Sequence, residues 1–332
     1  MVRMSAARMP AVLVTGGAGF VGSNLVRMLT GWRVRVLDSL VAGTRPGNLP
    51  PDVDLVVGDV RDASTLTSAM RGCHAVVHLA AAGSVVDSVA DPAANFDVNV
   101  RGTLTVLEAA KAGGVERVVA ASTGGALIGD TPPPVDEDSV PRPVSPYGAG
   151  KAAAEAYCHA YAKSYGLRTI ALRFANLYGP FSGHKKGAVS AFLCALHDGK
   201  PLVIYGDGRA TRDFIHVSDV CAAIERSLTG DVAGGSVMHL ATGVETSVRE
   251  LADACRTVAG RPGYPVEYRP ARPGEVERNA ASYRLAERLI GFRPTVRLHE
   301  GLAQTWSWYL RHVFDGSARR AAHASSGVGV PA

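Results

Sequence analysis

Tyr147 and Lys151 are the two residues whose types and spacing most directly suggest chemistry. They stand four positions apart in Tyr147-Gly148-Ala149-Gly150-Lys151, so on a helix their side chains share one face. An ammonium group beside a phenol favours the phenolate and lowers the tyrosine pKa toward neutrality. A phenol of lowered pKa is suited to act as a general base on a hydroxyl group. The same spacing also arises often by chance, so the pair needs further signals to define a site.

A glycine-rich stretch near the start of the chain predicts a site for a dinucleotide. The apolar residues 12–14 predict a buried strand, and the glycines after them predict a tight turn into a helix. Such a turn lets the backbone approach a pyrophosphate, which then lies against the amide donors at the positive end of the helix. The alternative is a glycine turn that only packs a helix onto a sheet. The predicted cofactor contacts in this stretch are Gly16, Gly19, Phe20, Val21 and Gly22.

Asp38 ends the second predicted strand, 22 residues after Gly16. A carboxylate at this position accepts hydrogen bonds from the hydroxyls of an adenosine ribose and repels a 2′-phosphate. Ser39 follows it and no arginine is adjacent, which predicts NAD rather than NADP as the cofactor. A strand-end aspartate that only shapes a turn is the alternative. Asp59 follows a third predicted strand and Gly58, where its carboxylate could reach the adenine amino group.

The elements that must position these residues alternate between strand and helix through the first half of the chain. Strands are predicted at 12–15, 34–38, 54–57, 75–79, 117–121 and 169–173, with a long helix around 94–112. This rhythm predicts an α/β fold, a Rossmann-type doubly wound parallel sheet. Ligands of such a sheet bind at the carboxyl ends of its strands.

The helix that carries Tyr147 is predicted to run to Tyr165, with Ser145 as its N-cap and Pro146 as its first residue. The proline-rich, acidic segment 131–146 before it predicts a surface loop. From residue 176 the alternation loosens, which predicts a smaller lobe over the open end of the sheet. We expect an NAD-binding domain at 1–175, a substrate lobe mainly at 176–314 with some chain returning to the sheet, and a poorly ordered tail at 315–332.

Composition limits the classes of partner. The 332 residues are 47% hydrophobic and 20% charged, which is ample for a large core. The formal net charge of +5 suits an anionic small molecule, but Lys and Arg are scattered, so nucleic acid is not an expected partner. No apolar run reaches transmembrane length and no signal peptide is indicated, so we expect a cytoplasmic protein without membrane partners. Five widely spaced cysteines without a CxxC pair predict reduced thiols and no metal site.

The motifs together resemble the extended short-chain dehydrogenase/reductase superfamily. Its order of motifs is matched by the glycines at 16, 19 and 22, Asp38, Asp59, Ala80-Ala81, Asn99, Ser122-Thr123 and Tyr147-x-x-x-Lys151. The likeness continues at 173–180, 204–208, 211–217 and 272–275 and spans about residues 11–312. Of the registers Gly16-x-x-Gly19-x-x-Gly22 and Gly17-x-Gly19-x-x-Gly22, the downstream tyrosine and lysine favour the first. The chain looks most like the nucleotide-sugar 4-epimerases of UDP-hexoses and UDP-hexuronates, which implies bound NAD, a UDP-sugar substrate and a homodimer.

The resemblance implies a role for each matching residue. Thr123 would hydrogen-bond the sugar 4-oxygen, Tyr147 would be the base, and Lys151 would hold the nicotinamide ribose and tune Tyr147. Further implied cofactor contacts are Ser39, Gly43, Asp59, Val60, Leu79, Ala80, Ala81, Asn99 and Phe174. The implied substrate contacts are Asn176, Arg212 and Arg272 on the phosphates, Tyr205 by the nucleoside and Glu275 by its ribose, with Ser84, Ser122, Lys186, Gly187, Ala188, Val189 and Asn279 elsewhere in the pocket. For each arginine, a surface ion pair is the alternative.

The implied reaction oxidises C4 to a 4-keto sugar, turns the sugar about its bond to the diphosphate, and reduces C4 from the other face. Counting from the strand assigns the catalytic hydroxyl to Thr123, whereas counting back from Gly129 would give Gly124, which has no hydroxyl. Sugar 4,6-dehydratases carry an Asp-Glu pair directly after this threonine. Gly124 and Gly125 occupy those positions here, which argues against dehydration.

The sugar is less clearly indicated than the reaction. The cationic run His184-Lys185-Lys186 could hold a C6 carboxylate, which favours conversion of UDP-glucuronate to UDP-galacturonate, with UDP-glucose to UDP-galactose next. A solvated loop is the alternative, and Phe181 stands where uronate epimerases commonly have an arginine. One rival is a UDP-glucuronate decarboxylase, which shares the 4-keto intermediate. The rival of another class is a non-catalytic NAD-sensing regulator, against which the intact catalytic set argues.

Overall fold

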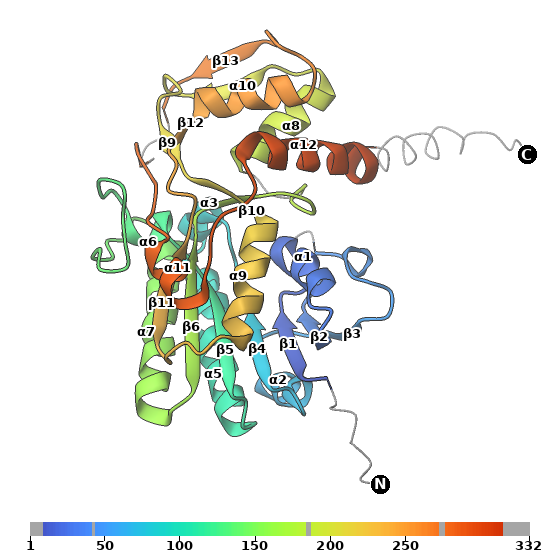
Figure 1. Ribbon diagram of the computed structural model, residues 1–332, viewed down its shortest axis with the longest axis vertical. Coiled ribbons are helices and arrows are strands. Elements are labelled where there is room, and N and C mark those ends of the chain that lie inside the picture. The colour runs from blue at the N-terminus through green and yellow to red at the C-terminus, as the bar shows by residue number, and fades with distance from the viewer. Residues whose placement is uncertain (1–8, 42–43, 184–186, 272–275, 315–332) are drawn as a thin grey trace, which may run out of the picture.

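The computed structural model describes residues 9–41, 44–183, 187–271 and 276–314. Figure 1 shows a large sheet with helices on both faces and a smaller lobe above one end of it. No helix in these ranges is both long and apolar enough to cross a membrane. The tail predicted at 315–332 lies outside the described residues.

A parallel sheet of seven strands organises the described chain, in the order β11-β6-β5-β4-β1-β2-β3. The strands are β1 (Ala11–Thr15), β2 (Arg33–Asp38), β3 (Asp54–Val57), β4 (Ala75–His78), β5 (Arg117–Thr123), β6 (Arg168–Phe174) and β11 (Ser236–Leu240). The strand order reverses between β1 and β4, and such a reversal leaves a ligand crevice at the carboxyl edge of the sheet. The α/β, Rossmann-type fold and the strands predicted from the sequence are confirmed.

Helices cover both faces of the sheet because its central strands are apolar on both sides. On β1, Val12 and Val14 pack into one core while Ala11 and Leu13 pack into the other, as the two-residue period of a strand requires. The first core includes side chains of α1 (Phe20–Met28), α9 (Val217–Thr229) and α11 (Arg284–Ile290). The second includes side chains of α2 (Ala63–Met70), α5 (Gly102–Ala112) and α7 (Pro146–Tyr165).

Short helical segments connect the strands at the carboxyl edge. They are η1 (Pro46–Asn48), α3 (Val85–Ala90), α4 (Pro92–Phe96), η2 (Asp97–Arg101) and α6 (Gly125–Ile128). The long helix predicted around 94–112 therefore consists of α4, η2 and α5 in direct succession.

The smaller lobe begins where β7 (Asn176–Tyr178) follows β6, so it lies over the carboxyl end of the sheet (Figure 1). Its strand pairs are β7 with β10 (Phe214–His216), β9 (Thr211–Arg212) with β12 (Thr246–Ser247), and β8 (Leu202–Tyr205) with β13 (Val266–Arg269). Its helices are α8 (Ala188–Asp198), α10 (Val248–Val258), α12 (Leu298–Tyr309) and η3 (Leu310–Phe314). Side chains of α8, α10 and α12 share one core with β8. Because α9, β11 and α11 belong to the large sheet and its core, part of the chain beyond residue 175 returns there.

Candidate active site

The turn after β1 brings two backbone segments too close together for side chains. Gly16 has φ +70°, and a Cβ on it would lie 2.7 Å from the amide nitrogen of Ala80, in the segment after β4. A Cβ on Gly22 would lie 2.5 Å from the carbonyl oxygen of Gly16. Gly19 is the N-cap of α1, so the first amides of this helix face the same turn. This cradle fits a dinucleotide pyrophosphate, as predicted.

Asp38 lies across that cradle at the end of β2 and is 5% exposed. Its Oδ2 accepts a hydrogen bond from Ala18 N at 2.9 Å and its Oδ1 accepts one from Leu40 N at 2.9 Å. These two bonds fix the carboxylate, and each oxygen keeps accepting capacity for a ribose hydroxyl. The Asp59 carboxylate instead pairs with Arg61 at 2.6 Å, and that guanidinium lowers its pKa. Its contact with adenine stays a prediction.

Asn99 holds the segment that follows β4. Its Oδ1 accepts from Ala82 N at 2.9 Å and its Nδ2 donates to Ala82 O at 3.2 Å. The predicted cofactor contacts Ala80 and Ala81 precede this clamp, so Asn99 shapes the edge of the cradle through its neighbours. The side chains of Phe20, Val60 and Phe174 are buried in the cores on the two faces of the sheet. Leu79 and Val21 pack against the core that contains Phe20 and Phe174, and Ser39 is half-buried.

The start of α7 is fixed by its cap and by a glycine contact. Ser145 caps the helix by accepting a hydrogen bond from Gly148 N at 3.2 Å, and Pro146 is its first residue, so both predictions are confirmed. A Cβ on Gly148 would lie 2.8 Å from the carbonyl carbon of Ala126 in α6 and closer still to its oxygen. Only glycine therefore lets the first turn of α7 meet the segment that follows Thr123. This contact fixes the first turn of α7, which carries Tyr147, against α6, the helix that directly follows β5.

The pKa of Tyr147 shifts in the direction opposite to the one that the sequence predicts. Lys151 is 5% exposed, and its Nζ donates a hydrogen bond to Ala121 O of β5 at 2.9 Å. Burial raises the pKa of Tyr147 to about 12, so the predicted lowering of this pKa is wrong for the protein alone. The physical reason is that burial disfavours the charged phenolate form.

The side chains of Ser122 and Thr123 point to opposite faces of β5, as successive strand residues must. Thr123 is half-buried at the strand end, where the catalytic hydroxyl is predicted. Ser122 is 6% exposed, and its Oγ donates to Glu155 Oε1 of α7 at 2.5 Å. The structure thus gives the Ser122 side chain a contact with α7, and its contact with substrate stays a prediction.

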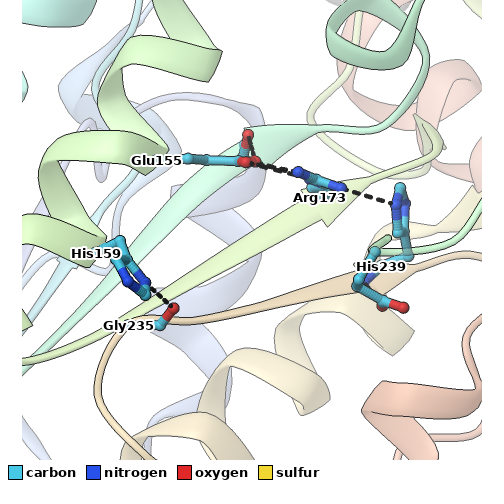
Figure 2. Close-up of polar contacts among 7 residues, drawn as sticks. Glu155, His159, Arg173, Gly235 and His239 are labelled. Carbon is cyan, nitrogen blue, oxygen red and sulfur yellow. Dashed lines mark hydrogen bonds and ion pairs between the residues drawn. The ribbon is translucent and has the colours of Figure 1, made fainter. Parts of the chain in front are cut away.

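Behind Ser122 lies a buried ionic network that sequence reasoning missed. Figure 2 shows the Glu155 carboxylate facing the Arg173 guanidinium, with His239 on the far side of the arginine. Arg173 donates to Glu155 through Nε and Nη2 at 3.0 and 2.9 Å, and its Nη1 lies 3.4 Å from His239 Nε2. Burial lowers the pKa of His239 to about 4, which leaves its imidazole neutral at pH 7. Glu155 stands four residues after Lys151 and so on the same face of the helix, and this spacing could have indicated from the sequence that Glu155 is buried.

Asn279 and Asn176 reach the same edge from the smaller lobe. A Cβ on Gly125 would lie 2.6 Å from Asn279 Nδ2, so this amide covers the glycine two positions after Thr123. Asn176 donates to Asp213 O through its backbone N at 2.9 Å and its Nδ2 at 3.2 Å, which places it beside the residue that follows Arg212. The structure thus brings Asn279 to Gly125, and Asn176 to the residue after Arg212.

The other predicted substrate residues are placed less directly. Tyr205 is half-buried at the end of β8, and Ser84 is the N-cap of α3, accepting from Asp87 N at 3.1 Å. Gly187 is the N-cap of α8 and Ala188 its first residue, whereas the Val189 side chain packs in the core of the lobe. Four of the predicted residues lie outside the described residues, namely Gly43, Lys186, Arg272 and Glu275. The whole cationic loop 184–186 lies outside them as well.

A phenol and a threonine hydroxyl at the edge of a dinucleotide cradle can exchange a proton with an alcohol whose carbon loses or gains hydride. The fold and these side chains define a dehydrogenase-like enzyme that uses a nicotinamide cofactor. The model of the NAD dependent epimerase/dehydratase family matches residues 12–241, and the chain belongs to this family, with NAD as its cofactor.

Individual relatives resemble the chain over nearly its whole length. A UDP-glucose 4-epimerase of Mycolicibacterium smegmatis is 41% identical over 310 residues, which cover 90% of this chain and 97% of that protein. The structure of the Thermotoga maritima UDP-glucose 4-epimerase with UDP-glucose matches with a TM-score of 0.87 at 33% identity, covering 91% of this chain and 99% of that one. MoeE5 in complex with UDP-glucuronic acid and NAD matches with a TM-score of 0.82 at 36% identity and the same coverage.

Proposed function

We propose that the protein is a nucleotide-sugar 4-epimerase that inverts C4 of a UDP-hexose. The observation that carries this proposal is the Gly148 contact, which packs the first turn of α7, with Tyr147 on it, against the segment that directly follows Thr123. The relatives named above include two UDP-glucose 4-epimerases. The set of Thr123, Tyr147 and Lys151 has no use in a protein that only binds NAD, which disfavours the regulator.

In the proposed mechanism Tyr147 takes the proton of the sugar 4-hydroxyl while Thr123 donates a hydrogen bond to the same oxygen. Bound NAD would supply the acceptor and the donor of hydride for C4 of the sugar. The high pKa of Tyr147 makes the phenol a poor base by itself. Lys151, one helical turn away, must therefore favour the phenolate when the site is filled, because a cation nearby stabilises the charged form.

The substrate must turn over while its diphosphate stays fixed. Arg212 suits this task because a planar guanidinium holds phosphate oxygens in pairs, and Asn176 lies near it. Arg272, predicted as the second clamp, is outside the described residues. The positive charge of the two arginines is complementary to the negative charge of the diphosphate in a UDP-sugar.

The absence of side chains at 124 and 125 disfavours dehydration, as the sequence predicts. Neither glycine can supply an acid or base, and Asn279 fills the space beside Gly125. An amide neither gives up nor accepts a proton near neutral pH, so Asn279 can orient a sugar hydroxyl but cannot drive elimination. These two positions therefore favour chemistry at C4 over dehydration.

For the sugar we propose UDP-glucose first, since the named epimerases act on it. UDP-glucuronate, favoured by the sequence, is the second candidate because MoeE5 holds UDP-glucuronic acid. Phe181 bears on this choice. Its ring lies 4.8 Å from that of Trp308 and 4.5 Å from the Arg27 guanidinium, so it is engaged between α12 and α1. No carboxylate-binding side chain stands at this position.

Product analysis with UDP-glucose, UDP-glucuronate and UDP-N-acetylglucosamine side by side tests the function. We expect the C4 epimer of at least one UDP-hexose, whereas a pentose product would identify a decarboxylase. Tyr147→Phe should abolish turnover while NAD remains bound, because it removes the proton acceptor and little volume. Full activity of Tyr147→Phe would refute the proposed mechanism.

We also propose that the protein is a homodimer. Val86 of α3, Phe96 of α4 and Tyr157 of α7 are 72%, 56% and 40% exposed on three helices that contact one another. A second copy of this face would cover them. Sedimentation should give a dimer for the wild type and a monomer for Phe96→Asp; a monomeric wild type contradicts the proposal.

A further inference from the structure

Glu155 extends the catalytic face of α7 by one turn into the protein. Tyr147, Lys151 and Glu155 stand at intervals of four residues, so they lie in a row along the helix. Glu155 is 8% exposed although it carries a carboxylate. Burial of a charge is costly unless it is paired and hydrogen-bonded, so its partners require an explanation.

Two consecutive residues of β5 are tied to this row. Lys151 donates to Ala121 O at 2.9 Å, and Ser122 Oγ donates to Glu155 at 2.5 Å. The next residue of the strand is Thr123. The two bonds therefore fix the position of α7 along β5 at the point where the catalytic hydroxyl leaves the strand.

Arg173 holds the carboxylate from the neighbouring strand. Its Nε and Nη2 bind both oxygens of Glu155, and the arginine side chain is 5% exposed (Figure 2). Neutral His239 lies beyond it and adds no second charge to the pair. Two parallel hydrogen bonds of this kind fix the orientation of the carboxylate relative to the guanidinium as well as the distance between them. Since Arg173 is on β6 and Ser122 on β5, Glu155 binds two strands at once.

We propose that Glu155 is a positioning residue that sets the register of α7 against β5, and thereby the geometry between the Tyr147 phenol and the Thr123 hydroxyl. It acts through Ser122 and Arg173 and does not touch the substrate. The inference rests on the proposed function, because it assigns Tyr147 and Thr123 to one proton-transfer site.

The same helix offers a matched control at its other end. Thr169 Oγ1 of β6 donates to Cys158 O of α7 at 2.6 Å, and both residues are buried. Ser122→Ala and Thr169→Val each remove one such bond between α7 and the sheet. Only the first bond lies next to a catalytic residue.

Steady-state kinetics with the active UDP-hexose should separate the two variants. Ser122→Ala should lower kcat about tenfold with KM changed less than about twofold, because the chemistry loses alignment while the diphosphate contacts remain. Thr169→Val should keep the wild-type kcat. Glu155→Gln, which keeps an acceptor for Ser122 but loses the charge facing Arg173, should lose at least as much kcat as Ser122→Ala.

Equal kcat for Ser122→Ala and Thr169→Val would overturn the proposal, and so would an increase in KM alone, which would mean that Ser122 binds substrate. Amide hydrogen exchange gives a readout that does not need activity. Ser122→Ala should speed exchange at 147–155 and Thr169→Val at 158–165. An inactive wild type would refute the proposed function, whereas unchanged exchange at 147–155 in Ser122→Ala would refute the positioning role.

Discussion

Replacing Gly148 by alanine should disable the enzyme although alanine is the better helix residue. The added Cβ would lie 2.8 Å from the Ala126 carbonyl carbon and closer to its oxygen, both of them backbone atoms that cannot rotate away. The first turn of α7 must then withdraw from α6 by about 1 Å to restore an ordinary contact. Tyr147, the preceding residue, moves with it and away from Thr123.

The expected loss follows from the sensitivity of proton transfer to alignment. A displacement of about 1 Å at a catalytic group costs on the order of 100-fold in rate. The Gly→Ala exchange by itself should favour the helix by about 1 kcal/mol. We therefore expect kcat for Gly148→Ala to fall about 100-fold, with NAD still bound because the glycine cradle is on β1 and α1.

Gly150 supplies the control on the same helix. A Cβ there would meet its nearest neighbours, Asn95 Oδ1 and Asn99 Cβ, at 3.5 Å, an ordinary contact. Gly150→Ala should leave kcat unchanged and raise the free energy of unfolding by about 0.5–1 kcal/mol. The assay is epimer formation under saturating UDP-hexose, with thermal unfolding in parallel. Wild-type kcat in Gly148→Ala, or equal losses in both variants, would refute the reasoning.

Three further outcomes can be measured. Asn279→Ala should raise KM about tenfold and leave NAD content unchanged, because the amide over Gly125 orients the sugar; an unchanged KM would remove it from the pocket. Asp38→Asn should weaken NAD retention about tenfold and narrow the preference over NADP, measured as nucleotide content after gel filtration, since the charge that repels a 2′-phosphate is lost. The pKa of His239 falls from its ordinary 6.5 to about 4 in the folded protein, so only the unfolded chain binds its proton between these values and stability is lost as pH falls through this window. The free energy of unfolding, measured with urea, should fall between pH 7 and pH 5 by about 2 kcal/mol less in His239→Asn than in the wild type. Equal falls in the two proteins would contradict the buried, neutral imidazole.

Local features of this protein were predictable because nearby residues decide them. Gly16 and Gly22 indicate a turn that approaches a ligand, Ser145-Pro146 indicates a helix start, and Tyr147 with Lys151 indicates one helical face. Each depends on steric or hydrogen-bonding rules that act over a few residues. The alternation of strands and helices fixed the class of sheet for the same reason.

Long-range features depended on the tertiary structure. Glu155, Arg173 and His239 come from α7, β6 and β11, and only the packing of α7 on the sheet makes them neighbours. Asn279 reaches Gly125 from 154 positions away, and Ser122 faces α7 because of the strand's alternation and the helix behind it. The direction of the Tyr147 pKa shift was mispredicted since desolvation depends on every atom around the phenol, which a spacing of four residues cannot describe. The sequence by itself determined which groups do the chemistry, and the tertiary structure decided how those groups are held and charged.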